Sequence, residues 1–129
     1  MELPLTPAPS ALPIARLLAR RSITSAADVL SALEALHREV LLDLPDPGHG
    51  TRAHHAGLIE IAAADLSLAR LTEGHTDART ILAELGTAPE DGLYGVWAAE
   101  PADASVTAQR RGSSYRLTGT KRYASGARS

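Results

Sequence analysis

The sequence contains no cysteine and no phenylalanine, and aromatic residues make up 3% of its 129 residues. Without cysteine the chain forms no disulfide and uses no thiolate chemistry, so we expect a cytoplasmic protein. Because aromatic side chains are the large core fillers, a core built from Leu, Ile, Val and Ala must rely on close helix packing. No apolar run approaches the ~20 residues that a membrane-spanning helix needs, so we expect no membrane span.

Charge of either sign is present, but it is unevenly distributed. The net charge of −2 gives no reason to expect nucleic acid as a partner. Residues 1–92 carry 7 basic and 13 acidic side chains, whereas residues 93–129 carry 6 basic and 2 acidic. The simpler interpretation of the basic segment is a solvated sheet face decorated with arginine. The alternative is attraction to an anionic ligand such as a phosphate-bearing cofactor.

Residues 12–92 have the pattern of a helical domain, preceded by an irregular arm over residues 1–11, where three prolines disfavour a helix. A short helix is expected over residues 12–21. A longer one follows over residues 22–44, with Ser25 as its cap and Asp28 in its first turn. Its expected buried stripe consists of Val29, Leu30, Leu33, Leu36, Val40 and Leu41. The segment "PDPGHG" should break the helix.

The next helix is expected over residues 54–71, with one face formed by Ile59, Ala62, Ala63, Leu66 and Ala69. Gly74 interrupts the helical pattern that follows, so a break or kink is expected there. The last stripe consists of Ala78, Ile81, Leu82 and Leu85. Gly86 is a natural residue to follow the end of that helix.

From Leu93 the hydrophobic period changes from that of a helix to that of a strand. The segments "LYGVWAAE", "SVTAQR", "SYRLTG" and "TKRYAS" are expected to be strands, with "RGSS" as a hairpin turn. The alternation places Val106, Ala108, Tyr115 and Leu117 on one face, and Thr107, Gln109, Arg116 and Thr118 on the other. The expected fold class is therefore α+β, an N-terminal α-helical domain followed by an incomplete antiparallel β segment.

Two motifs within this order of helices and strands resemble those of the acyl-CoA dehydrogenase flavoproteins. "WAAEP" (97–101) resembles the family's Ala-Leu-Thr-Glu-Pro, and "GTKRYAS" (119–125) resembles its Gly-x-Lys-x-Trp-Ile-Thr. The segment "DLSLARLTEGHTDARTIL" is similar to the helix pair that precedes the β domain. The resemblance spans residues 50–129, and residues 12–44 only in pattern. It implies an N-terminal portion of such a protein, with residues 93–129 as the truncated start of the middle β domain.

The resemblance also implies FAD as cofactor and an acyl-CoA-type substrate that is dehydrogenated at its α and β carbons. Tyr123 takes the place of an aromatic near the flavin ring, and Ser125 that of a hydroxyl residue near flavin N5. Ala99 takes the place of a family threonine, so only its backbone contact can persist. His75 is expected near the acyl pocket. The family's catalytic base comes from a C-terminal helical domain, so no catalytic residue is assigned here.

Other interpretations of the sequence stay open beside this one. The chain could be a non-enzymatic interaction module that pairs with a separate subunit, or belong to a flavin-dependent monooxygenase of the same fold. An open sheet edge favours a homo-oligomer or association with a missing C-terminal part. No metal site is expected, because the adjacent His54 and His55 point in different directions on a helix.

Overall fold

Four helices form the body of the chain in the computed structural model, which describes residues 11–45, 47–99, 101–103 and 105–127. Their bounds are α1 Ala11–Leu18, α2 Ala26–Arg38, α3 Pro47–Ala64 and α4 Leu66–Glu84. The predicted helical character of residues 12–86 is confirmed, whereas the predicted arm lies, except for its last residue, outside the described residues. None of the described helices is long and apolar enough to cross a membrane.

Helix α2 begins at the predicted cap. The Ser25 side chain accepts a hydrogen bond from the Asp28 backbone N–H, and its hydroxyl donates to the Asp28 carboxylate at 2.8 Å. The same carboxylate accepts from the Thr24 backbone N–H at 3.0 Å. These bonds, that from Ser25 foremost, hold the pKa of Asp28 below its usual value. The turn is thus fixed by residues adjacent in sequence.

Helix α2 ends earlier than predicted, and Val40, one of its expected core residues, is not buried. Val40 follows the C-cap with a φ of 58°, and its side chain is 66% exposed. The Val40 N–H donates to the His37 carbonyl and the Leu41 N–H to the Leu36 carbonyl, both at 2.9 Å. This Schellman motif terminates the helix even though a β-branched residue occupies the left-handed position, where glycine is usual.

The predicted breaks in the following helices are also misplaced. The chain reverses at Asp65, whose side chain caps α4 by accepting from the Leu68 N–H at 2.8 Å. Gly74 lies inside the uninterrupted α4, because a single glycine costs a helix only about 1 kcal/mol. In the segment "PDPGHG", α3 already begins at Pro47, and the kink falls at Gly50. A side chain on Gly50 would collide with Pro45.

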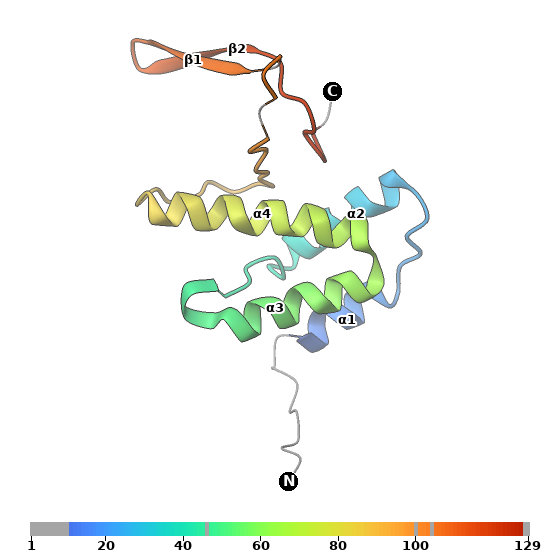
Figure 1. Ribbon diagram of the computed structural model, residues 1–129. Coiled ribbons are helices and arrows are strands. Elements are labelled where there is room, and N and C mark those ends of the chain that lie inside the picture. The colour runs from blue at the N-terminus through green and yellow to red at the C-terminus, as the bar shows by residue number, and fades with distance from the viewer. Residues whose placement is uncertain (1–10, 46, 100, 104, 128–129) are drawn as a thin grey trace.

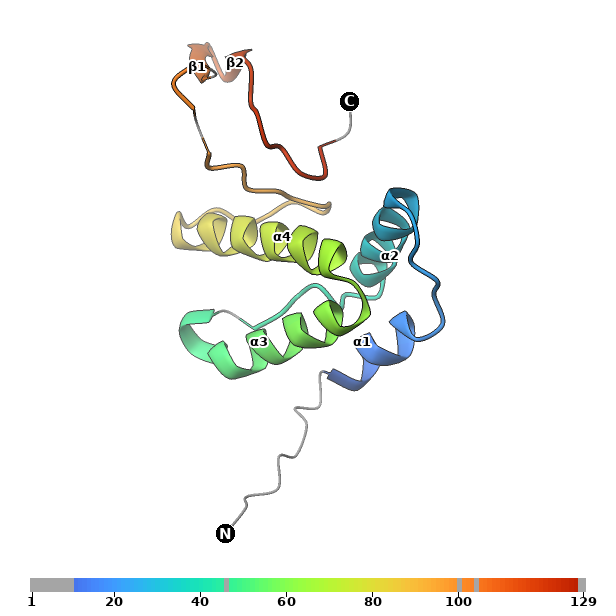
Figure 2. The same cartoon turned by 45° about the vertical axis from the view of Figure 1, so that its right-hand side comes forward.

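The core lies between the four helices. Figures 1 and 2 show α4 running back over α3, with α1 beside α3 and α2 beside α4. The buried cluster consists of Ile14, Leu18, Val29, Ala32, Leu33, Leu36, Leu42, Ile61 and Leu68. Ile59 and Leu66 are exposed instead, so the stripe predicted through them is wrong. The stripe predicted for the end of α4 is only partly right, because Ala78 is buried whereas Ile81 and Leu85 are exposed.

A two-stranded antiparallel hairpin stands apart from the helices (Figure 1), with β1 Val106–Arg111 and β2 Ser114–Gly119. The predicted turn is confirmed, and Gly112 opens it with a φ of 63°. The register pairs Ala108 with Leu117 and Gln109 with Arg116, so the two predicted faces are confirmed as well. Neither strand contacts a helix. The four helices and this small antiparallel sheet make the described chain an α+β protein.

The other two predicted strands are absent from the described residues. Residues 93–99 have no strand partner, and neither do residues 121–127. A strand requires a hydrogen-bonded neighbour, which a periodic sequence alone does not provide. The prediction that residues 93–125 are predominantly β is therefore wrong outside the hairpin.

Candidate functional site

The segment of residues 93–99 is attached to α4 by a buried histidine. The Tyr94 backbone N–H donates to Nδ1 of His75 at 3.1 Å, and the His75 side chain is completely buried. Gly74, the residue immediately before His75 on α4, lies close to the backbone of Val96. These contacts hold the segment across the middle of α4.

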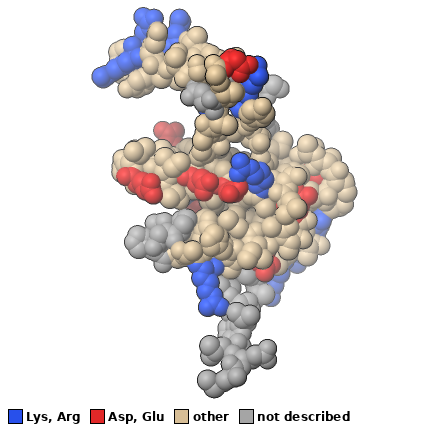
Figure 3. All heavy atoms as spheres, in the orientation of Figure 1, with Lys and Arg blue, Asp and Glu red and all other residues tan. Residues whose placement is uncertain are grey.

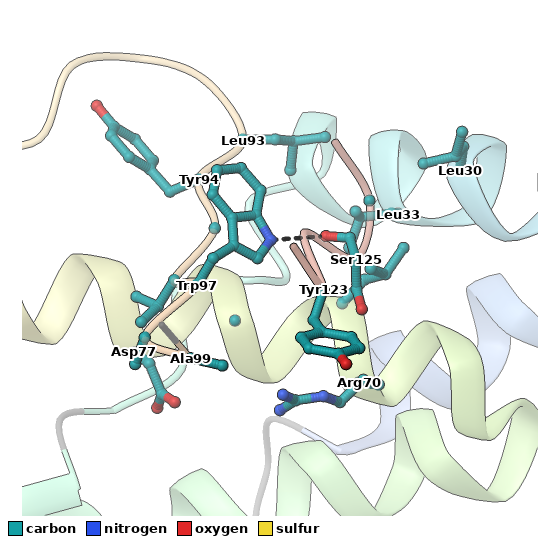
Figure 4. Close-up of a pocket in the computed structure, with 16 residues that line it drawn as sticks. Leu30, Leu33, Arg70, Asp77, Leu93, Tyr94, Trp97, Ala99, Tyr123 and Ser125 are labelled. Carbon is teal, nitrogen blue, oxygen red and sulfur yellow. Dashed lines mark hydrogen bonds between the residues drawn. The ribbon is translucent and has the colours of Figure 1, made fainter. Parts of the chain in front are cut away.

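A second segment, the turn of residues 123–126, is attached to the first. The indole Nε1–H of Trp97 donates to the backbone carbonyl of Ser125 at 2.9 Å (Figure 4). Gly126 has a φ of 77°, and a side chain there would meet Leu71 of α4. Glycine at this position therefore allows both the left-handed turn and its close approach to the helix.

These two segments, α2 and α4 enclose a cleft of about 590 Å³. The structure brings the three residues predicted to contact a cofactor, Ala99, Tyr123 and Ser125, to this one cleft (Figure 4). It does not bring His75 there: His75 lies buried under residues 93–96 and does not line the cleft. Gly74 and Asp77 on either side of it in sequence line the cleft, whereas the His75 side chain faces the protein interior.

The cleft offers an exposed aromatic ring and a hydroxyl. Tyr123 has a φ of 59°, and 76% of the residue is exposed. Ser125 uses its carbonyl for Trp97, while its hydroxyl makes no hydrogen bond to another described residue. Ala99 is exposed and offers only backbone groups. The arrangement can stack one flat ring system and hydrogen-bond its edge.

Sequence reasoning missed the contribution of α4 to the cleft. Arg70, Gly74 and Asp77 all line it, and their spacing of four and three residues puts them on one helix face. Arg70 also pairs with Glu73 one turn away. The sequence does show that Arg70, Gly74 and Asp77 share one face of a helix. This spacing identifies a binding site only when another segment is known to cross that face.

The basic C-terminal segment does not supply the cleft with charge. None of its described Lys or Arg residues lines the cleft, whereas Arg70 of α4 does. Arg110, Arg111 and Arg116 belong to the hairpin, and Arg122 pairs with Asp103 at 2.8 Å. The geometry therefore favours the interpretation of the basic segment as a solvated sheet face over its interpretation as a site that attracts a phosphate-bearing cofactor.

His75 is held neutral in the core. Burial above all, together with the nearby Arg79 and His37 side chains and against a smaller opposing effect of Asp43, lowers the pKa of His75 to about 4. Because Nδ1 accepts the Tyr94 N–H, the ring proton must sit on Nε2, which has no partner among the described residues. His37 meets the His75 ring edge-on at 5.9 Å. The ring acts as a buried acceptor that fixes the cleft wall.

The other histidines are not arranged around a common point. His54 is buried, and its Nδ1–H donates to the Pro45 carbonyl at 2.9 Å, whereas His55 is exposed. His37 lies 3.2 Å from an Asp91 carboxylate oxygen through its Nε2. Within the described part of the chain, no group of three or more His, Cys, Asp or Glu residues is placed to hold a metal ion.

Comparison of the chain with protein-family models, with curated proteins and with solved structures found no match.

Proposed function

We propose that this cleft is one wall of the flavin site of an acyl-CoA dehydrogenase-like oxidoreductase, to which the chain contributes the N-terminal helices and the beginning of the β domain. One observation carries the proposal: the two segments that bear the family-like motifs, far apart in the sequence, converge on one cleft through the Trp97–Ser125 hydrogen bond.

The residues of the cleft fit a flavin ring better than a whole dinucleotide. A volume of about 590 Å³ is within the range of small-molecule sites, roughly 300–1,000 Å³. Tyr123 would stack on the ring, and the Ser125 hydroxyl and the Ala99 backbone would hydrogen-bond its edge. When bound, a flavin would supply the hydride acceptor for oxidation of the acyl chain.

The chain's own groups would serve to bind and orient. Leu30, Leu33 and Leu71 give the cleft an apolar side, and hydrogen bonds from Tyr94 to His75 and from Trp97 to Ser125 hold the segment of residues 93–99 in place. The proposal assigns no catalytic base to these residues, so we expect an acyl thioester of the CoA type to be oxidised only when further protein completes the site.

A titration of the chain with FAD, measured by isothermal titration calorimetry, tests the proposal. So few contacts, partly exposed, should give weak binding, with a Kd of ~1 mM, because ordering and desolvation costs offset much of their energy. Tyr123→Ala should weaken binding further, and Tyr123→Trp should preserve it. Tyr115→Ala is the matched control, because Tyr115 is a similarly exposed tyrosine outside the cleft.

Two outcomes would contradict the proposal. If FAD does not bind saturably at concentrations several times the expected Kd, the chain does not bind a flavin. If Tyr115→Ala and Tyr123→Ala lower the FAD affinity equally, the flavin does not bind in this cleft. A micromolar site on the single chain would instead show that the cleft needs no further walls.

The uncovered hairpin favours a second candidate, an interaction module without chemistry of its own. Its strands contact no helix, and a lone two-stranded hairpin is marginally stable at best. Under this alternative FAD would not bind, and the hairpin would acquire a protein partner.

A further inference from the structure

One face of the hairpin exposes apolar side chains beside an arginine. Tyr115 and Leu117 are 65% and 69% exposed. Arg110 is paired with Tyr115 across the strands and therefore shares this face. Its Nε–H donates to the Gly112 carbonyl at 3.1 Å, which holds the guanidinium at the turn. We call Arg110, Tyr115 and Leu117 the hairpin patch.

The outer face of α4 has the complementary character. Ile81 and Leu85 are 44% and 72% exposed, and the exposed Glu84 lies between them in sequence. Glu73 and Asp77 extend the row of acidic side chains toward the helix start. We call Ile81, Glu84 and Leu85 the helix patch. Figure 3 shows the acidic side chains in a row along α4 and the basic ones gathered on the hairpin.

We propose that the hairpin patch of one copy docks on the helix patch of a second copy of this chain. Leu117 and Tyr115 would cover Ile81 and Leu85, and Arg110 would face Glu84. Each copy carries one patch of each kind, so a reciprocal exchange satisfies both and closes a two-fold dimer. The occupant is a second copy because the chain itself supplies the opposite charge and a matching apolar surface.

The hairpin is held away from the helix patch of its own chain. The Trp97–Ser125 hydrogen bond and the Asp103–Arg122 ion pair tie together the two segments from which the hairpin extends. Held at this base, the strands contact none of the chain's own helices. Neither patch lines the cleft, so variants in the two patches leave the residues proposed to hold the flavin unchanged.

Sedimentation velocity over a range of concentrations at low salt tests the contact, with circular dichroism to confirm that each variant folds. We expect reversible dimers that Arg110→Glu weakens about tenfold and Glu84→Arg weakens similarly, while the double variant restores affinity by reversing both charges. Arg116→Glu is the matched control, because Arg116 lies on the opposite face of the hairpin. It should change dimerisation little.

The contact is overturned if the chain stays monomeric at all concentrations, if Arg110→Glu and Arg116→Glu weaken the dimer equally, or if the double variant fails to regain affinity. Raising the salt concentration should weaken the dimer of the original chain, since the charges are exposed and screened. A dimer insensitive to salt and to both charge reversals would place the interface elsewhere.

Discussion

The helical body and the hairpin are stabilised in opposite ways. In the body, side chains from all four helices meet in one buried cluster. In the hairpin, most side chains are exposed, and the strands are held by each other and by the glycine that opens their turn. The hairpin therefore takes its shape from local sequence, and the body from contacts between distant residues. The cleft lies where the two are joined.

The sharpest test of this contrast compares two leucines. Leu68 is completely buried in the core, and Leu117 lies on the open face of the hairpin. We expect Leu68→Ala to lower the free energy of unfolding by roughly 2–5 kcal/mol, because it removes packed volume. Leu117→Ala should change it by less than about 0.5 kcal/mol. Urea unfolding at a concentration where the chain is monomeric measures both. Equal effects would mean that the hairpin packs on the body in solution.

The buried histidine makes the body sensitive to acid. The pKa of His75 is about 4 in the folded chain, against 6.5 for an ordinary histidine. Between these pH values the unfolded chain binds the extra proton, so stability falls as the pH drops from about 6.5 to about 4, by about 3 kcal/mol in all.

The matched variant for this prediction is His75→Gln, which keeps an acceptor for the Tyr94 N–H and does not titrate. Urea unfolding at several pH values measures the free energy of unfolding of the original chain and of this variant. As the pH drops from about 6.5 to about 4, the original chain should lose stability relative to the variant. If the difference in free energy of unfolding stays constant from pH 7 to pH 4, His75 is not the source of the acid sensitivity.

A single hydrogen bond from Trp97 contributes to the junction between the two regions. Trp97→Phe keeps an aromatic ring but removes the donor to the Ser125 carbonyl. We expect a loss of about 1 kcal/mol in local stability, and hence roughly fivefold faster tryptic cleavage after Lys121 and Arg122. The hairpin register, observed by NMR as contacts between Ala108 and Leu117, should be unchanged. An altered register would show that the hairpin depends on the body.

The smallest effect concerns two helix ends of the same geometry. Val40 and Gly86 both follow a C-cap with positive φ, at 58° and 68°. Val40→Gly relieves the strain of a β-branched residue there and should raise the free energy of unfolding by about 0.5–1 kcal/mol. Gly86→Ala should lower it by about 1 kcal/mol. Thermal unfolding measures both, and a destabilising Val40→Gly would contradict the assigned strain.

Much of the candidate site could be anticipated only by resemblance. The two motifs point to Ala99, Tyr123 and Ser125, and the structure places these residues around one cleft. No motif points to Arg70 and Asp77, because their face of α4 becomes a wall of the cleft only where residues 93–99 cross it. His75 was expected to face the pocket. Its position on a helix does not tell which face of that helix residues 93–99 cover.

Interactions between neighbours in sequence determined the features that were predicted correctly. The cap formed by Ser25 and Asp28, the helix end at Gly86 and the hairpin with its two faces each depend on residues a few positions apart. The tertiary structure decided the rest. Residues 93–99 have the pattern of a strand but lie on a helix without a strand partner. Whether a periodic segment pairs, and which face of a helix is covered, depends on distant segments, because burial and hydrogen-bond partners are shared across the fold.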